Sequence, residues 1–125
     1  RETVLNILYA ADNHGQSLTD YLDEQPVEPE QFVSDLVKGI STHLERIDSM
    51  IDQFAEGWST ERMPIIDKAL LRMATYEVLY RLDIPIEAIL SEAVALASEY
   101  STEQSSRFIN GVVASISEET RTNST

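Results

Sequence analysis

The sequence predicts an all-α domain of six or seven helices. Apolar residues recur every three or four positions along most of the chain, which is the spacing of a helix face packed on a core. No segment keeps the strict apolar–polar alternation of a half-buried strand. The 125 residues, of which 42% are hydrophobic and 25% charged, with four Gly and four Pro, have the size and composition of one globular domain.

The clearest element is the run from Trp58 to Tyr80, WSTERMPIIDKALLRMATYEVLY. Pro64 suits the first position of a helix, where its missing N–H would have had no partner, and it keeps the preceding residue extended. The spacing then predicts a helix from about Pro64 to Arg81 that is apolar on nearly all sides, so other helices must pack around it. Because an unpaired buried charge is costly, the charged residues within it must reach the rim or find partners. They are Asp67, Lys68, Arg72 and Glu77.

Three helices are predicted before this element. The first runs from Glu2 to about Ala11 and ends toward Gly15, and a short second helix is capped by Ser17. A turn-prone stretch of residues 25–29 follows. One apolar stripe then spans residues 32–54, with a kink expected at Gly39 or at residues 41–43, and Gly57 ends it.

Two helices are predicted after it. Pro85 marks a second break, and the helical spacing from residue 86 to 100 predicts a helix whose start is set either there or at Ser91. A polar turn of residues 101–105 precedes a last helix over about residues 106–117. The chain therefore divides into a helical domain of residues 1–117 and a polar tail of residues 118–125, which has no apolar residue and should fray.

The acidic charge restricts the possible partners. Nine Lys and Arg against 22 Asp and Glu give a formal net charge of −13, which argues against nonspecific nucleic-acid binding and leaves room only for a local site. Solubility is the simpler reading of this acidity. The sequence has no cysteine, no apolar run long enough for a membrane span and no signal-peptide pattern, so a cytoplasmic protein is expected.

No pattern indicates catalysis, a metal or a cofactor. His14 and His43 lie in different helical regions without the spacing of metal ligands, and no Ser has a paired His at a recognisable turn. The four glycines build no phosphate-binding loop. We expect a binding protein and not an enzyme.

Two helix junctions carry groups that look exposed. Glu61, Arg62 and Asp67 flank Pro64, where the alternatives are an ordinary surface and contact with a partner. The turn from Tyr100 to Phe108 combines two aromatics, several hydroxyls and an Arg at a helix N-terminus, which suits single-stranded RNA. Two core aromatics beside an ordinary helix cap would give the same pattern.

The chain resembles the NusB family of transcription antitermination factors. The resemblance extends from Arg1 to Ile116 and rests on the order and spacing of several short groups. These are Arg1-Glu2, Leu8-Tyr9, Gly57-Trp58-Ser59, Glu61 to Pro64, Asp67-Lys68-Ala69, Leu71-Arg72, Tyr76-Glu77, Leu79-Tyr80, Asp83 to Pro85, Glu92 to Val94, Ser101-Thr102 and Arg107 to Val112.

This resemblance implies a fold, partners and site residues. The family has two small perpendicular helical bundles, and its members pair with NusE, a small-subunit ribosomal protein, and bind boxA RNA within the RNA polymerase antitermination complex. The positions that match family residues facing NusE are Glu61 and Asp67. Those that match positions near the RNA are Arg1, Tyr9, Tyr100, Gln104, Ser105, Ser106, Arg107 and Phe108.

Some departures and alternatives remain at this level. The arginine-rich segment that the family carries before the position of Arg1 is not in this chain, so weaker phosphate contact is expected. A NusB-like domain also precedes the catalytic part of ribosomal RNA cytosine methyltransferases, which makes an RNA-binding accessory domain the alternative function. A homodimer is possible as well, because some family members self-associate.

Overall fold

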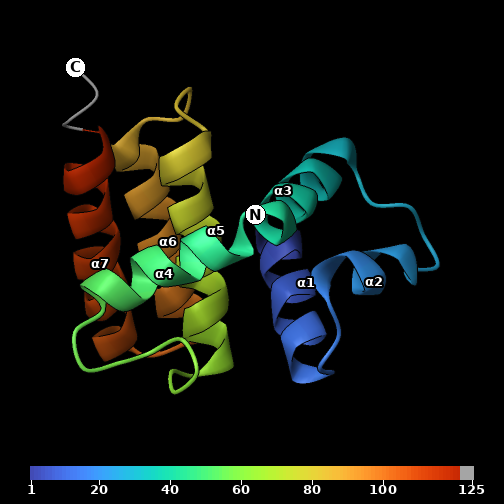
Figure 1. Ribbon diagram of the computed structural model, residues 1–125, viewed down its shortest axis with the longest axis horizontal. Helices are drawn as coiled ribbons and strands as arrows, with labels where there is room; N and C mark the ends of the chain where they lie inside the picture. Colours follow the sequence, from blue (N-terminus) through green and yellow to red (C-terminus); the bar gives the residue numbers. More distant parts are fainter. Residues whose placement is uncertain (122–125) are drawn as a thin grey trace.

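The computed structural model describes residues 1–121 and consists there of seven α-helices without a strand (Figure 1), which confirms the predicted all-α class. The helices are α1 (Glu2–Asn13), α2 (Leu18–Asp23), α3 (Gln31–Thr42), α4 (Leu44–Phe54), α5 (Ile65–Tyr80), α6 (Ile86–Tyr100) and α7 (Glu103–Arg121). As predicted, Ser17 caps α2: its hydroxyl accepts a hydrogen bond from the backbone N–H of Asp20 at 3.2 Å.

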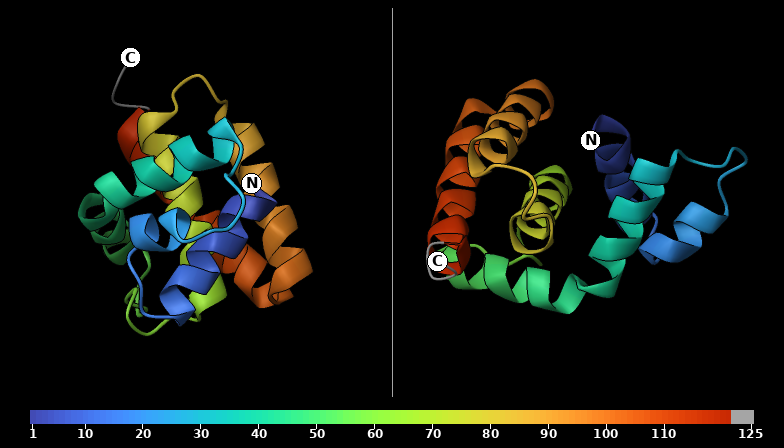
Figure 2. Two further views of the ribbon diagram at one scale, coloured as in Figure 1. Left: turned by 90° about the vertical axis from the view of Figure 1, so that its right-hand side faces the viewer. Right: turned by 90° about the horizontal axis from the view of Figure 1, so that it is seen from above.

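The helices form two groups that share α5. Helices α1, α2 and α3 pack on one another at one side of the molecule, and α5, α6 and α7 pack at the other side (Figure 1). Helix α4 lies across α5 and α7 and leads back to α3 (Figure 2). Helix α5 contacts α1, α3, α4, α6 and α7, so the predicted central, multiply packed helix is confirmed.

The charged residues of α5 have partners. Three of the four form ion pairs with other helices or with the chain start: Lys68 with Asp12, Arg72 with Asp48, and Glu77 with Arg1, each at 2.7 Å. The fourth, Asp67, is described below. Each of these three pairs joins α5 to a different segment, so the paired charges contribute to the arrangement of the two groups.

The long apolar stripe of residues 32–54 is two helices. His43 ends α3 and begins α4, with a backbone φ of −109° that is not helical. The predicted kink at residues 41–43 is therefore confirmed as a complete break, whereas Gly39 lies within α3. The stripe is continuous in sequence because both helices bury one face, but α3 packs on α1 and α2 while α4 packs on α7.

Two other boundaries differ from the prediction. Helix α6 begins directly after Pro85, so Ser91 is an exposed residue within the helix and not its cap. Helix α7 begins three residues earlier than expected and continues through residues 118–121, the first half of the predicted tail. Residues 122–125, the rest of that tail, lie outside the described residues.

Arg121 explains why the helix continues. Its guanidinium donates hydrogen bonds of 2.7–3.1 Å to four backbone carbonyls at the end of α5 and in the turn after it. The acceptors are Glu77, Val78, Arg81 and Ile84. The carbonyls of Glu77 and Arg81 also accept backbone hydrogen bonds, so the Arg121 side chain adds a second donor to them and binds those of Val78 and Ile84 as well. It thereby ties the end of α7 to the end of α5. An apolar pattern cannot reveal such an anchor.

Candidate protein and nucleic-acid interface

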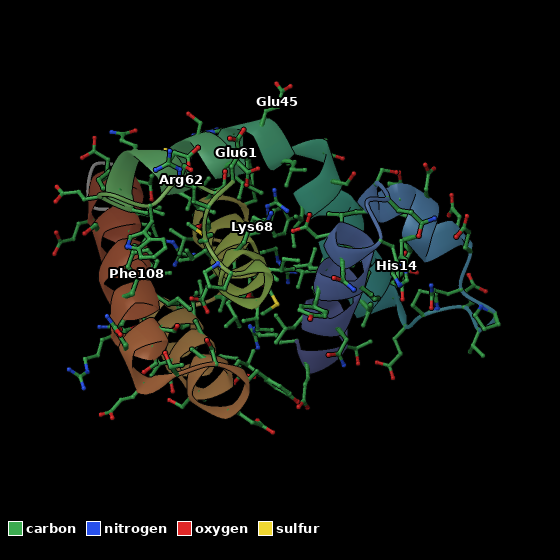
Figure 3. The ribbon with its side chains drawn as sticks, turned by 90° about the horizontal axis from the view of Figure 1, so that it is seen from below. His14, Glu45, Glu61, Arg62, Lys68 and Phe108 are labelled. Carbon is green, nitrogen blue, oxygen red and sulfur yellow. The ribbon has the colours of Figure 1, made fainter. Side chains whose placement is uncertain are left out.

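The two junctions singled out in the sequence meet in one pocket. The loop between α4 and α5 and the turn between α6 and α7 border a half-open pocket of about 200 Å³, here called the junction pocket. It is lined by Trp58, Met63, Pro64, Asp67, Thr102, Gln104, Ser105 and Phe108. In Figure 3, Glu61 and Arg62 lie on the loop before α5 and Phe108 lies on α7, at the opposite end of the molecule from His14.

Asp67 lies in the wall of the junction pocket and is only 5% exposed. One carboxylate oxygen accepts a hydrogen bond from the Ser101 hydroxyl and the other from the Ser105 hydroxyl, both at 2.9 Å. The expectation that Asp67 is an exposed group is therefore wrong, because the α6–α7 turn folds over it. The two serines lie 34 and 38 residues away in sequence, so no local sequence pattern could predict this contact.

The pocket is apolar at its walls and negative at Asp67. Trp58, Met63, Pro64 and Phe108 supply the apolar surface, and no Lys or Arg is among the lining residues. Trp58 is 51% exposed. It was noted only as part of the family pattern, although a half-exposed Trp beside a pocket is typical of a binding surface. In the sequence, only its position next to Gly57, after the apolar stripe has ended, could have indicated that Trp58 lies outside the core.

Glu61 and Arg62 are exposed, as expected, on the outer side of the same loop. Asp52 at the end of α4 holds this loop by accepting a hydrogen bond from the backbone N–H of Thr60 at 2.7 Å. A shallow hollow lined by Asp52, Trp58, Glu61 and Arg62, among others, continues the surface outward from Trp58. The carboxylate of Glu61 is thus open to a partner, unlike that of Asp67.

The residues of the α6–α7 turn point in different directions. Gln104 and Arg107 are exposed, and Ser105 and Phe108 are half-buried at the pocket. Arg107 pairs with Glu103 at 3.2 Å, but both side chains are more than three-quarters exposed, so this pair is weak and easily exchanged. Ser106 is buried and its hydroxyl donates to the Glu103 carbonyl at 3.0 Å, so it is not part of the exposed surface of this turn.

Tyr9 and Tyr100 are exposed by 43% and 40%, which excludes a core position for Tyr100. The Tyr100 hydroxyl donates to the Glu2 carboxylate, so the end of α6 meets the start of α1. Glu2 and Tyr9 lie seven residues apart in α1 and therefore on the same helix face. The structure thus places both rings along one side of α1.

Arg1, which the family resemblance predicts near the RNA, contacts a buried carboxylate of α5 in the structure. Its guanidinium binds Glu77 through Nε and Nη2, and these hydrogen bonds raise the pKa of Arg1 although burial opposes the shift.

Within residues 1–121, no helix is long and apolar enough to span a bilayer, and no three His, Asp or Glu side chains cluster as metal ligands.

Comparison with known proteins gives a consistent result. The chain matches the model of the NusB family over residues 1–118. It is 40% identical over 112 residues to the transcription antitermination protein NusB of Syntrophotalea carbinolica, covering 90% of this chain and 72% of that protein. It is 37% identical over 122 residues to the NusB protein of Kineococcus radiotolerans, covering 94% and 90%.

Solved structures agree on the fold. The structure of T. maritima NusB matches with a TM-score of 0.82 and 33% identity, covering 94% of this chain and 87% of that one. A structure of the antitermination factors NusB and NusE in complex with dsRNA matches with a TM-score of 0.78 and 22% identity, covering 94% and 92%.

Proposed function

The chain belongs to the NusB family of antitermination factors, and we propose that it acts by holding NusE and boxA RNA side by side without catalysing a reaction. The observation that carries this proposal is the junction pocket, where the α4–α5 loop meets the α6–α7 turn. A protein bound at the loop and an RNA bound at the turn would lie in contact with each other. Such an adaptor promotes assembly by placing two ligands together.

NusE binds the α4–α5 side. Trp58 provides an exposed aromatic anchor, Glu61 an accessible carboxylate, and the pocket an apolar cavity with Asp67 beside it. A Lys or Arg side chain fits this combination, because its aliphatic stem packs on apolar walls while its charge approaches the carboxylates. Asp67 contributes through the negative potential and by holding the α6–α7 turn.

RNA binds the side formed by α1 and the α6–α7 turn. Tyr9 and Tyr100 offer ring faces for unpaired bases, and Arg107 and Gln104 offer donors for phosphates and base edges. Arg107 is one of few cations available for this. Of the other eight Lys and Arg, all within residues 1–121, four are in ion pairs and Arg121 is bound to carbonyls, whereas the pair of Arg107 with Glu103 is exposed and weak.

The relatives support the adaptor over the accessory domain of a methyltransferase. Both NusB proteins named above are antitermination proteins, of which this chain covers 72% and 90%. No observation in the structure favours the second function.

The test is a titration of the full-length protein with boxA RNA, with and without NusE. We expect NusE to tighten RNA binding and Glu61→Lys to weaken NusE binding by about tenfold, or 1.4 kcal/mol. Glu28→Lys is the matched control, because Glu28 is also exposed but lies in the α2–α3 loop, away from the α4–α5 loop (Figure 1). Equal losses in both variants would indicate a general charge effect and contradict the assigned surface.

Mass measurement during the same titration separates the adaptor from a homodimer. A complex with one copy of each partner supports the proposal. A stable dimer of this chain that binds neither NusE nor RNA would contradict it.

A further inference from the structure

Arg1 lies over a buried carboxylate. Its Nε is 3.0 and 3.1 Å from the two carboxylate oxygens of Glu77, and its Nη2 is 2.7 Å from one of them. The Glu77 side chain is 2% exposed and that of Arg1 24%. This is a two-pronged contact, for which the planar fork of Arg is suited and the point charge of Lys is not.

The buried Glu77 restricts what Arg1 can do. Arg1 is the one cation paired with the Glu77 carboxylate within residues 1–121. If the guanidinium turned toward an RNA phosphate, it would leave this carboxylate buried and uncompensated, which costs more than one exposed phosphate contact returns. The positive charge of Arg1 is therefore committed to Glu77 and is not available to an RNA strand.

The neighbouring residue makes a second connection. Glu2 accepts the hydrogen bond of the Tyr100 hydroxyl, so two consecutive residues fasten the start of α1 to both α5 and α6. Glu2 shares its helix face with Tyr9. The position of the Tyr100 ring relative to the Tyr9 ring thus depends on how this end of α1 lies against α5, and the Arg1–Glu77 contact holds it there.

We propose that Arg1 and Glu77 are positioning residues for single-stranded RNA, and that Arg1 is not a phosphate ligand. Their contact holds the start of α1 so that Glu2 keeps the Tyr100 ring on the same surface as Tyr9. This inference rests on the proposed function, since it concerns the same RNA surface. It differs from the role expected for Arg1 from the family resemblance.

The experiment measures RNA affinity across a range of salt concentrations in the full-length protein. Arg1→Lys keeps the positive charge but cannot make the two-pronged contact with Glu77. The RNA-binding surface is then no longer held in place before binding, so we expect RNA affinity to fall by about tenfold. The dependence of the affinity on salt concentration should not change. The double variant Arg1→Met/Glu77→Gln removes one charge of each sign. It keeps the net charge, avoids an unpaired Glu77, and should show the same loss at the same slope.

The matched controls are at Arg107. Arg107→Ala should flatten the salt slope by about 0.7, the value for one phosphate contact on a single strand. Arg107→Lys should retain most of the affinity. If Arg1→Lys binds RNA as the parent does, or if the double variant flattens the slope as Arg107→Ala does, Arg1 is a phosphate contact and the inference is wrong.

A second measurement needs no RNA and separates this inference from the proposed function. NMR signals of the Tyr9 and Tyr100 rings in the free protein should shift in Arg1→Lys and in the double variant, but not in Arg107→Ala. Unchanged Tyr100 signals would overturn the inference whatever the RNA result. If the parent protein fails to bind boxA RNA while the ring signals shift as expected, the proposed function fails and the positioning contact stands.

Discussion

Gly39 of α3 lies directly against the ring of Tyr76 of α5, so that a Cβ at position 39 would overlap the Tyr76 hydroxyl and ring carbons. Helix α3 belongs to the group of α1, α2 and α3, and this close approach is one of the places where that group meets the shared helix α5. Gly39 has ordinary helical geometry, since the positive-φ glycines among the described residues are Gly15 and Gly57. Glycine is needed at position 39 because any side chain there would collide with Tyr76.

We therefore expect Gly39→Ala to destabilise the protein, although alanine is the better helix former. Overpacking at a well-packed contact costs about 1–3 kcal/mol. Gly111→Ala is the control, because a Cβ there meets nothing within 4 Å and should stabilise α7 by up to about 1 kcal/mol. Urea unfolding of both variants measures the two effects. Stabilisation by Gly39→Ala would show that the helices can separate at this point at no cost.

Removal of the Arg121 guanidinium should loosen the end of α5. Arg121→Met loses the hydrogen bonds to the four carbonyls, and a hydrogen bond to a charged group contributes about 1.5–3 kcal/mol net. Hydrogen exchange should become faster for the amides of the last turn of α5 and of α7. Arg107→Met, which removes an exposed pair, should leave both unchanged. Unaltered exchange in Arg121→Met would contradict the anchoring role.

Asp67 and Ser105 should be coupled in stability. Asp67→Ala leaves the hydroxyls of Ser101 and Ser105 without their acceptor, so a loss of about 1–3 kcal/mol is expected. In a double-mutant cycle, Asp67→Ala and Ser105→Ala should be non-additive by about 1 kcal/mol. Glu61→Ala, at an exposed carboxylate, should stay within about 0.5 kcal/mol of the parent. Additive losses would mean that the Asp67–Ser105 hydrogen bond contributes little.

Trp58 should report NusE binding directly. It is the single Trp of the chain, half of it is exposed, and it lines the junction pocket. Saturating NusE should therefore protect Trp58 fluorescence from a soluble quencher, and Trp58→Ala should weaken NusE binding by about 2 kcal/mol, as at an interface anchor. Equal quenching in the free and bound protein would place the NusE surface elsewhere.

The sequence alone predicted much of the helical framework. The apolar spacing and the breaks before Pro64 and Pro85 located α5 and α6, and the all-round apolar character of α5 predicted its central place. These features are local, because helix periodicity and proline geometry act over a few neighbouring residues. The NusB resemblance also came from short groups in order along the chain, and the family match over residues 1–118 confirms it.

The contacts that define the candidate site could not be predicted in this way. Asp67 was expected to be exposed because it follows Pro64 at a helix start, and its cover comes from serines of the α6–α7 turn. Ser106 was expected near the RNA because it matches such a position in the NusB family, but α7 begins three residues before it and turns it inward. The exposure of Asp67 depends on serines that are close in space but far away in sequence. The exposure of Ser106 depends on where α7 begins, which the polar sequence before it does not reveal.

The amino-acid sequence by itself determined where helices form, which one is central and how acidic the surface is, because these follow from residue type and local spacing. Only the tertiary structure decided that Arg1 is committed to Glu77, that Arg121 closes the end of α5, and that the two junctions share one pocket. Hydrogen bonds and ion pairs require specific atoms to come within about 3 Å. That distance is set by how the helices pack together and not by the order of residues within any one of them.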